Sequence, residues 1–404
     1  MAGYKINSGH DRKKIIPLII LIVLISFNLR APITGVGSLT NIIREEFSLS
    51  PGEAGLLTTL PLLAFAAVSP SAGLLARKFG AGRVFIIGSA VLMIGILIRS
   101  CFGRTGIFAG TVIIGAAIAI GNVLLPAVIK SIFPDRIGVM TSLYTVIMQV
   151  VSSFSTAVCV PVSMLLGWRW ALGIWLIPAA AALIACIITK DLSLSDQNIM
   201  DKSTVQTEGF SREKTLLKNR MTWWITLYMG VQSMMFYSFI AWLSPMMQDK
   251  GYDAVMSGYL LSLYVIMGMA GSAALPYIMR CCRNQSVTGT VLGTLYLIGM
   301  VNMMLSSYMI MMLAGIIICG FCSGACVSFS MALFGFHTSS GSSASELSGT
   351  AQAGGYLIAA AGPVFLGRLF DITGSWNIPI AVLMSAAVFL VFAGRITGRD
   401  EIIK

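Results

Sequence analysis

Long apolar runs, separated by short polar loops, recur along the whole chain. Each run is near or above the roughly 20 residues that a helix needs to cross the hydrocarbon core of a bilayer. The pattern predicts twelve spanning helices, at residues 15–39, 53–76, 82–101, 105–130, 137–165, 169–189, 221–247, 254–279, 286–306, 308–336, 345–370 and 376–396.

The sixth and seventh runs are separated by a longer polar stretch, rich in Asp, Ser, Lys and Glu, which predicts a solvated linker. The two halves that it joins resemble each other weakly: an offset of 203 residues maps Gly55 onto Gly258 and Arg77 onto Arg280. Paired repeats are common in secondary transporters. The predicted fold class is an all-α membrane protein with two pseudo-symmetric six-helix bundles. Its expected parts are a tail (1–14), the first bundle (15–189), the linker (190–220), the second bundle (221–396) and a tail (397–404).

Composition excludes an ordinary soluble fold. Of 404 residues, 56% are hydrophobic and 11% are charged, whereas soluble proteins carry about 25% charged residues. The net charge of +11 would suit nucleic acid, but its placement indicates membrane topology instead. With both termini in the cytoplasm, 20 Lys and Arg lie inside and 6 outside, which leaves Arg30 within a span. We therefore predict a multi-pass protein of the cell inner or plasma membrane, with no need of a nucleic-acid partner.

Arg30 is the leading candidate to bind a solute. A charge this far inside a membrane helix costs roughly 2.5–3.5 kcal/mol on insertion scales, and it is tolerated where it faces a polar cavity or a partner. No Asp or Glu lies in the middle of any predicted helix; Glu45, Glu46, Glu346 and Asp371 are near helix ends. We therefore expect Arg30 to bind an anionic group of the solute, or to be held by amides and carbonyls.

Other polar side chains inside the spans extend this expected site. Several recur at helical spacing on one face of a span, and amide or phenol groups can assist an arginine in binding an anion. The alternative is that they only bond between helices, which is worth about 0.6 kcal/mol each. The predicted substrate-binding set is Asn28, Arg30, Thr34, Asn122, Gln149, Gln232, Gln352 and Tyr356.

The end of the second apolar run carries a short motif of glycines and basic residues. Residues 73–83, Gly-Leu-Leu-Ala-Arg-Lys-Phe-Gly-Ala-Gly-Arg, resemble the loop signature between helices 2 and 3 of the major facilitator superfamily. That superfamily usually has an acid where this chain has Ala76, which puts one expected salt bridge in doubt. Simple anchoring by cytoplasmic positive charge is the alternative. The residues assigned to gating are Gly73, Arg77, Lys78, Gly80 and Arg83.

More specific motifs resemble one family within that superfamily, the cyanate and nitroimidazole transporters. They lie at 28–37 in the first run, at 167–170, and at 347–356, 361–363 and 367–376 around the eleventh run. The resemblance implies alternating access, a cavity lined by helices 1, 4, 7 and 10, and movement of small anionic or weakly polar solutes in either direction. It also implies a monomer. No cofactor is expected.

Coupling to protons is left open by the sequence. Many proton-driven relatives use a carboxylate within the membrane, and none is found here. His337, near the end of the tenth run, is a candidate proton site because histidine titrates near neutral pH. The alternative is an interfacial residue without a proton-carrying role. Uniport and anion–proton symport both remain open.

Other functions are weighed against transport. Cys319, Cys322 and Cys326 share a helix face, but small packing residues are favoured over a soft-metal site. The chain has no HExxH, GxSxG or P-loop motif, which argues against an enzyme or an ATP-driven pump. The alternatives retained are broad-specificity drug efflux, whose expected intramembrane acid is missing, and a membrane sensor that does not transport.

Overall fold

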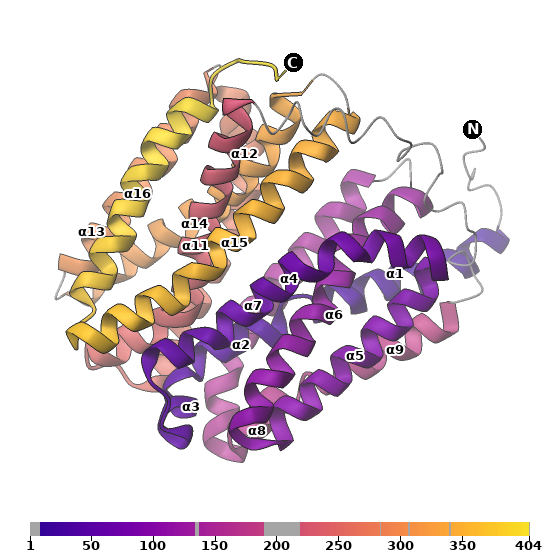
Figure 1. The fold of residues 1–404 in the computed structure, drawn as a ribbon, viewed down its shortest axis with the longest axis horizontal. Helices are drawn as coiled ribbons and strands as arrows, with labels where there is room; N and C mark the ends of the chain where they lie inside the picture. Colours follow the sequence, from indigo (N-terminus) through magenta and orange to yellow (C-terminus); the bar gives the residue numbers. More distant parts are fainter. Residues whose placement is uncertain are drawn as a thin grey trace. The chain divides into compact units, whose positions relative to one another are not determined.

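The computed structural model describes residues 9–133, 137–189, 219–282, 284–305, 308–338 and 341–403, and every regular element in those ranges is an α-helix (Figure 1). The helices are α1 (Gly9–Asn28), α2 (Ala31–Ser38), α3 (Thr40–Phe47), α4 (Pro51–Phe79), α5 (Ala81–Cys101), α6 (Gly103–Ile132), α7 (Ile137–Leu166), α8 (Trp168–Gly173), α9 (Leu176–Thr189), α11 (Arg220–Asp249), α12 (Ala254–Cys281), α13 (Gln285–Leu305), α14 (Met309–Phe336), α15 (Gly341–Thr373) and α16 (Asn377–Thr397).

Eleven helical segments in the described ranges are long and apolar enough to cross a membrane. The expected span at 221–247 is the 30-residue helix α11, which is long enough but is not among the eleven. This helix carries buried polar side chains such as Thr226, Gln232 and Ser238. A helix surrounded by other helices meets little lipid, so it can be less apolar than the rest.

The first predicted span is interrupted. Helix α1 ends at Asn28 and α2 begins at Ala31, so Leu29 and Arg30 lie outside both helices. The cause is Pro32, which has no N–H to donate to the carbonyl of Asn28 and whose ring clashes with the preceding turn. The sixth span is divided in the same way, into α8 and α9, and the short helix α3 was not expected.

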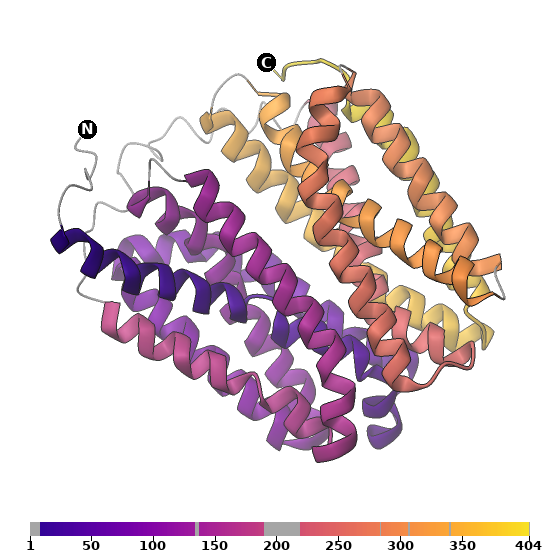
Figure 2. The same ribbon diagram turned by 180° about the vertical axis from the view of Figure 1, so that it is seen from behind.

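The contacts divide the chain into two compact units, each a bundle of helices (Figures 1 and 2). Unit 1 contains the described parts of residues 1–39 and 63–204, where α5 packs against α6 and α9, and α2 packs against α7. Unit 2 contains those of 40–62 and 205–404, where α11 packs against α15, and α12 and α13 against α14. The predicted linker falls almost entirely outside the described residues.

Residues 40–62 come from the first half of the sequence but pack within unit 2. Their helix α4 starts with a capping box, in which Ser50 Oγ accepts from the N–H of Glu53 at 3.2 Å and Glu53 Oε2 accepts from the N–H of Ser50 at 2.9 Å. The carboxylate of Asp371 in α15 accepts from the N–H of Gly52 at 2.8 Å. Gly55 lets the two helices approach closely, since a Cβ there would lie 2.6 Å from the carbonyl oxygen of Pro363.

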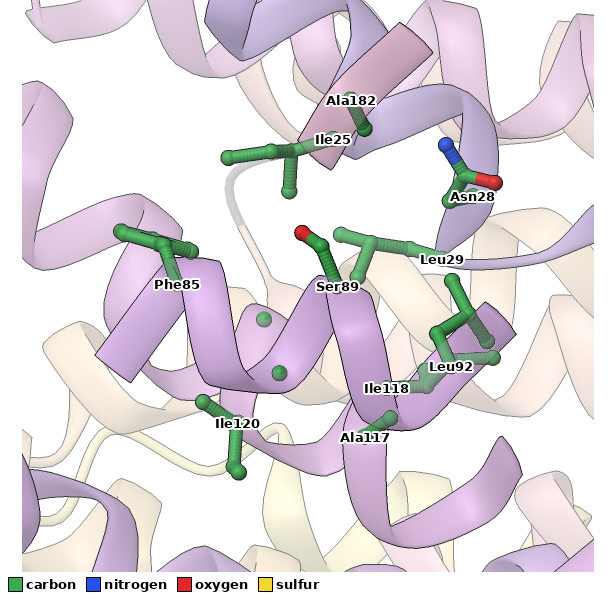
Figure 3. Close-up of a pocket in the computed structure, with 12 residues that line it drawn as sticks. Ile25, Asn28, Leu29, Phe85, Ser89, Leu92, Ala117, Ile118, Ile120 and Ala182 are labelled. Carbon is green, nitrogen blue, oxygen red and sulfur yellow. The ribbon is translucent and has the colours of Figure 1, made fainter. Parts of the chain in front are cut away.

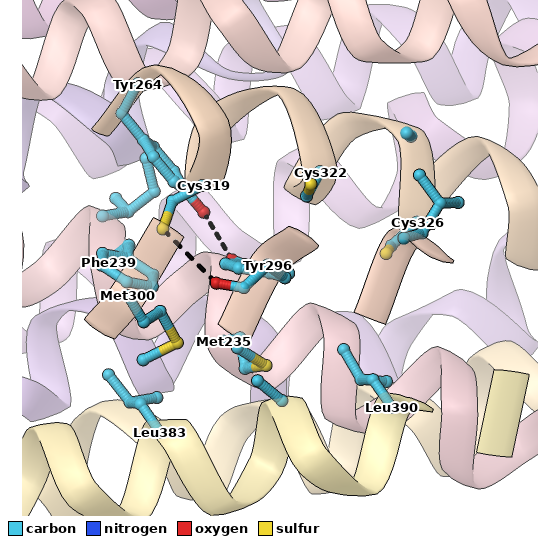
Figure 4. Close-up of a cluster of buried hydrophobic side chains, with 14 of the residues drawn as sticks. Met235, Phe239, Tyr264, Tyr296, Met300, Cys319, Cys322, Cys326, Leu383 and Leu390 are labelled. Atoms are coloured by element: carbon cyan, nitrogen blue, oxygen red, sulfur yellow. Dashed lines mark hydrogen bonds between the residues drawn. The ribbon is translucent and has the colours of Figure 1, made fainter. Parts of the chain in front are cut away.

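The core of unit 2 is apolar and rich in aromatic rings. Phe239 of α11 stacks on Tyr264 of α12 with ring centroids 5.1 Å apart, and the hydroxyls of Tyr264 and Tyr296 are 3.1 Å apart. Cys319, Cys322 and Cys326 of α14 are buried in this cluster of side chains (Figure 4). Their place in the core agrees with the packing role favoured from the sequence.

Candidate solute-binding site

Arg30 lies at the interruption of the first membrane span, where it caps the N-terminus of α2. Its backbone has left the helical conformation (φ −128°, ψ −45°), and its carbonyl accepts from the N–H groups of Ile33 and Thr34 at 3.0 and 3.1 Å. The side chain is half-buried and interacts electrostatically with Tyr144 of α7. The break therefore brings a guanidinium and the positive end of a helix dipole to one place in the span.

Helix α2 is held in unit 1 by side chains from two neighbouring helices. Ser155 of α7 donates to the carbonyl of Ala31 at 2.9 Å, and Ser38 donates to the carbonyl of Thr156 at 2.8 Å. Arg99 of α5 donates from Nη1 to the carbonyl of Pro32 at 2.5 Å. These hydrogen bonds attach both ends of α2 to its neighbours, so the N-terminus of α2 has a fixed position in unit 1.

Arg99 was missed by the sequence analysis, which counted it among the charges outside the membrane. It lies in the last turn of α5 and is 1% exposed. Its Nε and Nη2 atoms have no hydrogen-bond partner among the described residues. An arginine at the end of an apolar run can be buried or can reach water, and the sequence does not distinguish the two cases. The burial of Arg99 could therefore not be predicted.

The membrane-spanning segments of unit 1 contain no acidic residue. Residues 12–44, 54–134 and 136–190 include no Asp or Glu. Asp371, one of the acids near a helix end, binds the N–H of Gly52 within unit 2. A half-buried guanidinium with five donors, beside a helix N-terminus, is suited to an anion such as a carboxylate or cyanate group.

Asn28 and Thr34, the other predicted solute-binding residues of the first span, make hydrogen bonds to backbone carbonyls. The Asn28 amide nitrogen donates to the carbonyls of Leu24 at 2.8 Å and Pro178 at 3.0 Å, which ties α1 to α9. Thr34 is fully buried and donates to the carbonyl of Arg30 at 3.2 Å. Both therefore shape the break around Arg30, and direct contact with a solute stays a prediction for them.

The other predicted residues lie on helices of both units. In unit 1, Asn122 of α6 and Gln149 of α7 are half-buried. In unit 2, Gln232 of α11 is 1% exposed and donates to Ser233 Oγ at 2.8 Å, and Gln352 of α15 donates to Ser348 Oγ at 2.7 Å. Tyr356, also half-buried, lies one turn further along α15. Helices α11 and α15, which carry these unit 2 residues, pack against each other.

A small cavity in unit 1 lies beside the break (Figure 3). Its volume is about 30 Å³, and α1, α5, α6 and α9 line it mainly with apolar side chains such as Leu29, Phe85 and Leu92. Asn28 and Ser89 are the polar side chains of its wall. This volume suits a water molecule and is too small for an organic solute, so the cavity is not a transport route.

The predicted gate is only partly described. The side chains at positions 73 and 77 lie outside the described part of the structure. Gly80 has φ +84° at the start of α5, a conformation that favours glycine, and it makes the sharp turn between α4 and α5. Lys78 and Arg83 are exposed. A gating role for these residues stays a prediction.

His337 is buried at the end of α14 rather than exposed at an interface. Its Nδ1 is 2.5 Å from the carbonyl oxygen of Glu401, and its Nε2 is 2.6 Å from that of Thr397. The carbonyl of His337 accepts from the N–H of Ile403 at 2.9 Å. Through these contacts, His337 ties the end of α14 to the end of α16 and to the residues that follow it.

Comparison with known proteins agrees with this description. The family model of the Major Facilitator Superfamily matches residues 18–363. The chain belongs to the major facilitator superfamily, so it is a multi-pass membrane transporter and not an enzyme. Both the superfamily and the likeness to its cyanate and nitroimidazole transporters are confirmed.

Relatives at the sequence level cover nearly the whole chain. An uncharacterised transporter of Bacillus subtilis (strain 168) is 36% identical over 96% of this chain and 94% of its own length. A 2-nitroimidazole transporter of Escherichia coli (strain K12) is 32% identical over 98% of both. A cyanate transport protein of the same organism is 24% identical over 89% of this chain and 91% of its own.

Solved structures show the same fold at low sequence identity. A bacterial homologue of the human lysosomal transporter Spinster has a TM-score of 0.74 at 14% identity and covers 96% of this chain and 97% of its own. A D-xylose–proton symporter has a TM-score of 0.73 at 12% identity, with 96% and 98% covered.

Proposed function

We propose that this transporter moves a small anionic or weakly polar solute, of the size of cyanate or a nitroimidazole, by alternating access. The position of Arg30 carries the proposal. The residue caps a helix N-terminus in the interruption of a membrane span, in a unit whose spans lack carboxylates. A guanidinium beside a helix N-terminus is well suited to bind an anionic group of a solute. The names of the two Escherichia coli relatives support the size and chemistry of the solute.

Besides Arg30, the proposed solute-binding residues of unit 1 are Asn122 and Gln149, and those of unit 2 are Gln352 and Tyr356. These four side chains are half-buried rather than fully packed. Gln232, in contrast, is almost completely buried and donates to Ser233 Oγ. The working unit in this proposal is a monomer in the plasma membrane with both termini in the cytoplasm.

Uptake of cyanate and of 2-nitroimidazole into proteoliposomes tests the proposal. We expect ATP-independent flux of at least one of them, with the KM for cyanate raised at least tenfold by Arg30→Gln and less by Arg30→Lys, which keeps the charge. Arg169→Gln, which removes an exposed arginine from α8, is the matched control and should leave the KM unchanged. Equal flux in wild type and Arg30→Gln would contradict the role of Arg30.

Broad drug efflux is the competing outcome of the same assay. Transport of lipophilic cations by wild type and Arg30→Gln alike, with no cyanate flux, would favour it. Flux in neither direction for any solute would favour the sensor.

A further inference from the structure

Arg99 is a buried cation that no acidic side chain offsets among the described residues of its own unit. Its guanidinium donates one hydrogen bond, from Nη1 to the carbonyl of Pro32, while Nε and Nη2 are closed off from solvent and without a partner among the described residues. Its other electrostatic neighbour is the thiol of Cys159. The C-terminus of α5 offsets only part of a full charge.

Such an arrangement is unfavourable in the protein without a solute. A guanidinium withdrawn from water loses its hydration, and each unpaired N–H adds a further penalty. A glutamine or an apolar residue would avoid both penalties at this position. The charge therefore has to be compensated in another state of the molecule, and the arrival of an anion nearby is the simplest compensation.

The location of Arg99 points to the anion site at Arg30. Arg99 binds Pro32, which is two residues beyond Arg30 in the first turn of α2. At a rise of 1.5 Å per residue, the guanidinium of Arg99 lies on the order of 10 Å from the break. Two unit charges at that separation interact strongly enough, in a medium of effective dielectric constant ~20, to change an affinity about tenfold.

We propose that Arg99 is a positioning residue of the anion site: it fixes the first turn of α2 through Pro32 and supplies a permanent positive charge behind Arg30, which favours anions over neutral solutes. The inference rests on the proposed function. It assigns selectivity for charge to a residue that does not touch the solute.

The first measurement needs no solute. Thermal unfolding of purified wild type, Arg99→Gln and Arg99→Lys is compared in potassium gluconate, with Arg104→Gln as the control for loss of an exposed arginine in the first turn of α6. Glutamine removes the buried charge together with its unpaired N–H groups, although its amide nitrogen ends two bonds short of the position of Nη1. We expect Arg99→Gln to unfold at the same temperature as wild type or above it. A decrease of several degrees would show that Arg99 serves the fold alone and would overturn the inference.

The second measurement uses fresh cyanate as the anionic probe and 1-methyl-2-nitroimidazole as the neutral one. Arg99→Gln should weaken cyanate binding about tenfold and leave the neutral probe unchanged. Arg99→Lys and Arg104→Gln should bind cyanate within about twofold of wild type.

The outcomes separate this inference from the proposed function. Cyanate binding that Arg30→Gln abolishes and Arg99→Gln leaves intact overturns the inference and leaves the proposed function standing. Equal loss of both probes in Arg99→Gln would show that only the shape of the site had changed, which also overturns it. Absence of cyanate binding to wild type overturns both.

Discussion

The side-chain amide of Asn28 joins helices α1 and α9. An experiment can distinguish this structural role from a role in solute binding. Asn28→Ala removes the hydrogen bonds to the carbonyls of Leu24 and Pro178. We expect a loss of about 1–3 kcal/mol in the free energy of unfolding, seen as a lower melting temperature, with a KM for the transported solute within about twofold of wild type. A tenfold rise in KM at unchanged stability would instead make Asn28 a solute ligand.

His337 offers a second test at this scale, because its two ring nitrogens face backbone carbonyls. His337→Ala removes both contacts and leaves a cavity, so we expect a loss of about 2–4 kcal/mol in stability. Proteolysis of the residues after α16 should become faster. The pH profile of transport should keep its shape; loss of that profile at unchanged stability would make His337 the proton carrier considered from the sequence.

Arg30 could be located from the sequence because a charge in an apolar run is conspicuous by itself. The interruption that makes it accessible was not predicted, although Pro32 is its cause. Arg99 could not be predicted, since burial at the end of a run depends on how α5 packs against the helices around it, here α6, α8 and α9. The hydrogen bond from Asn28 to the carbonyl of Pro178 likewise depends on a neighbour that is distant in sequence.

At the scale of helices, small residues decide how closely neighbours approach. A Cβ at Gly324 of α14 would overlap the carbonyl oxygen of Gly268 in α12, whereas a Cβ at Gly335 of the same helix would meet no atom within 4 Å. Gly324→Leu should therefore force the helices apart and cost several kcal/mol of stability. Gly335→Ala, the matched control, should be neutral or slightly stabilising. Melting temperatures and the yield of folded protein provide the comparison, and equal behaviour of the two variants would contradict this packing.

Most helices could be predicted from the apolar runs, because the bilayer sets the length and the composition of a spanning helix. The repeat offset of 203 residues also appears in the structure: α4 begins at Pro51 and α12 at Ala254. Helix α11 was predicted as a span although its buried polar residues keep it below the hydropathy of the others. The short elements α2, α3 and α8 were not predicted, since local breaks leave little trace in the average hydropathy of a run.

For the whole molecule, the helical membrane fold could be predicted from the sequence. Which segment packs in which unit could not be predicted. Twelve apolar runs, a polar linker and the superfamily motifs were enough for the fold. The packing of residues 40–62 within unit 2 rests on contacts such as the bond from Gly52 to Asp371, which joins residues 319 apart. No local pattern in a single sequence marks such a pair.

That long separation has a consequence for the order in which the protein is made. A ribosome completes residues 40–62 while most of the chain is still untranslated, at a rate of about 5–20 residues per second. Their partners in α15, including Pro363 and Asp371, follow more than 300 residues later. The first part of α4 therefore enters the membrane about tens of seconds before α15 is made and can pack against it. Truncated chains that end before α15 should leave this segment open to quality-control proteases, although every residue in it is already in place.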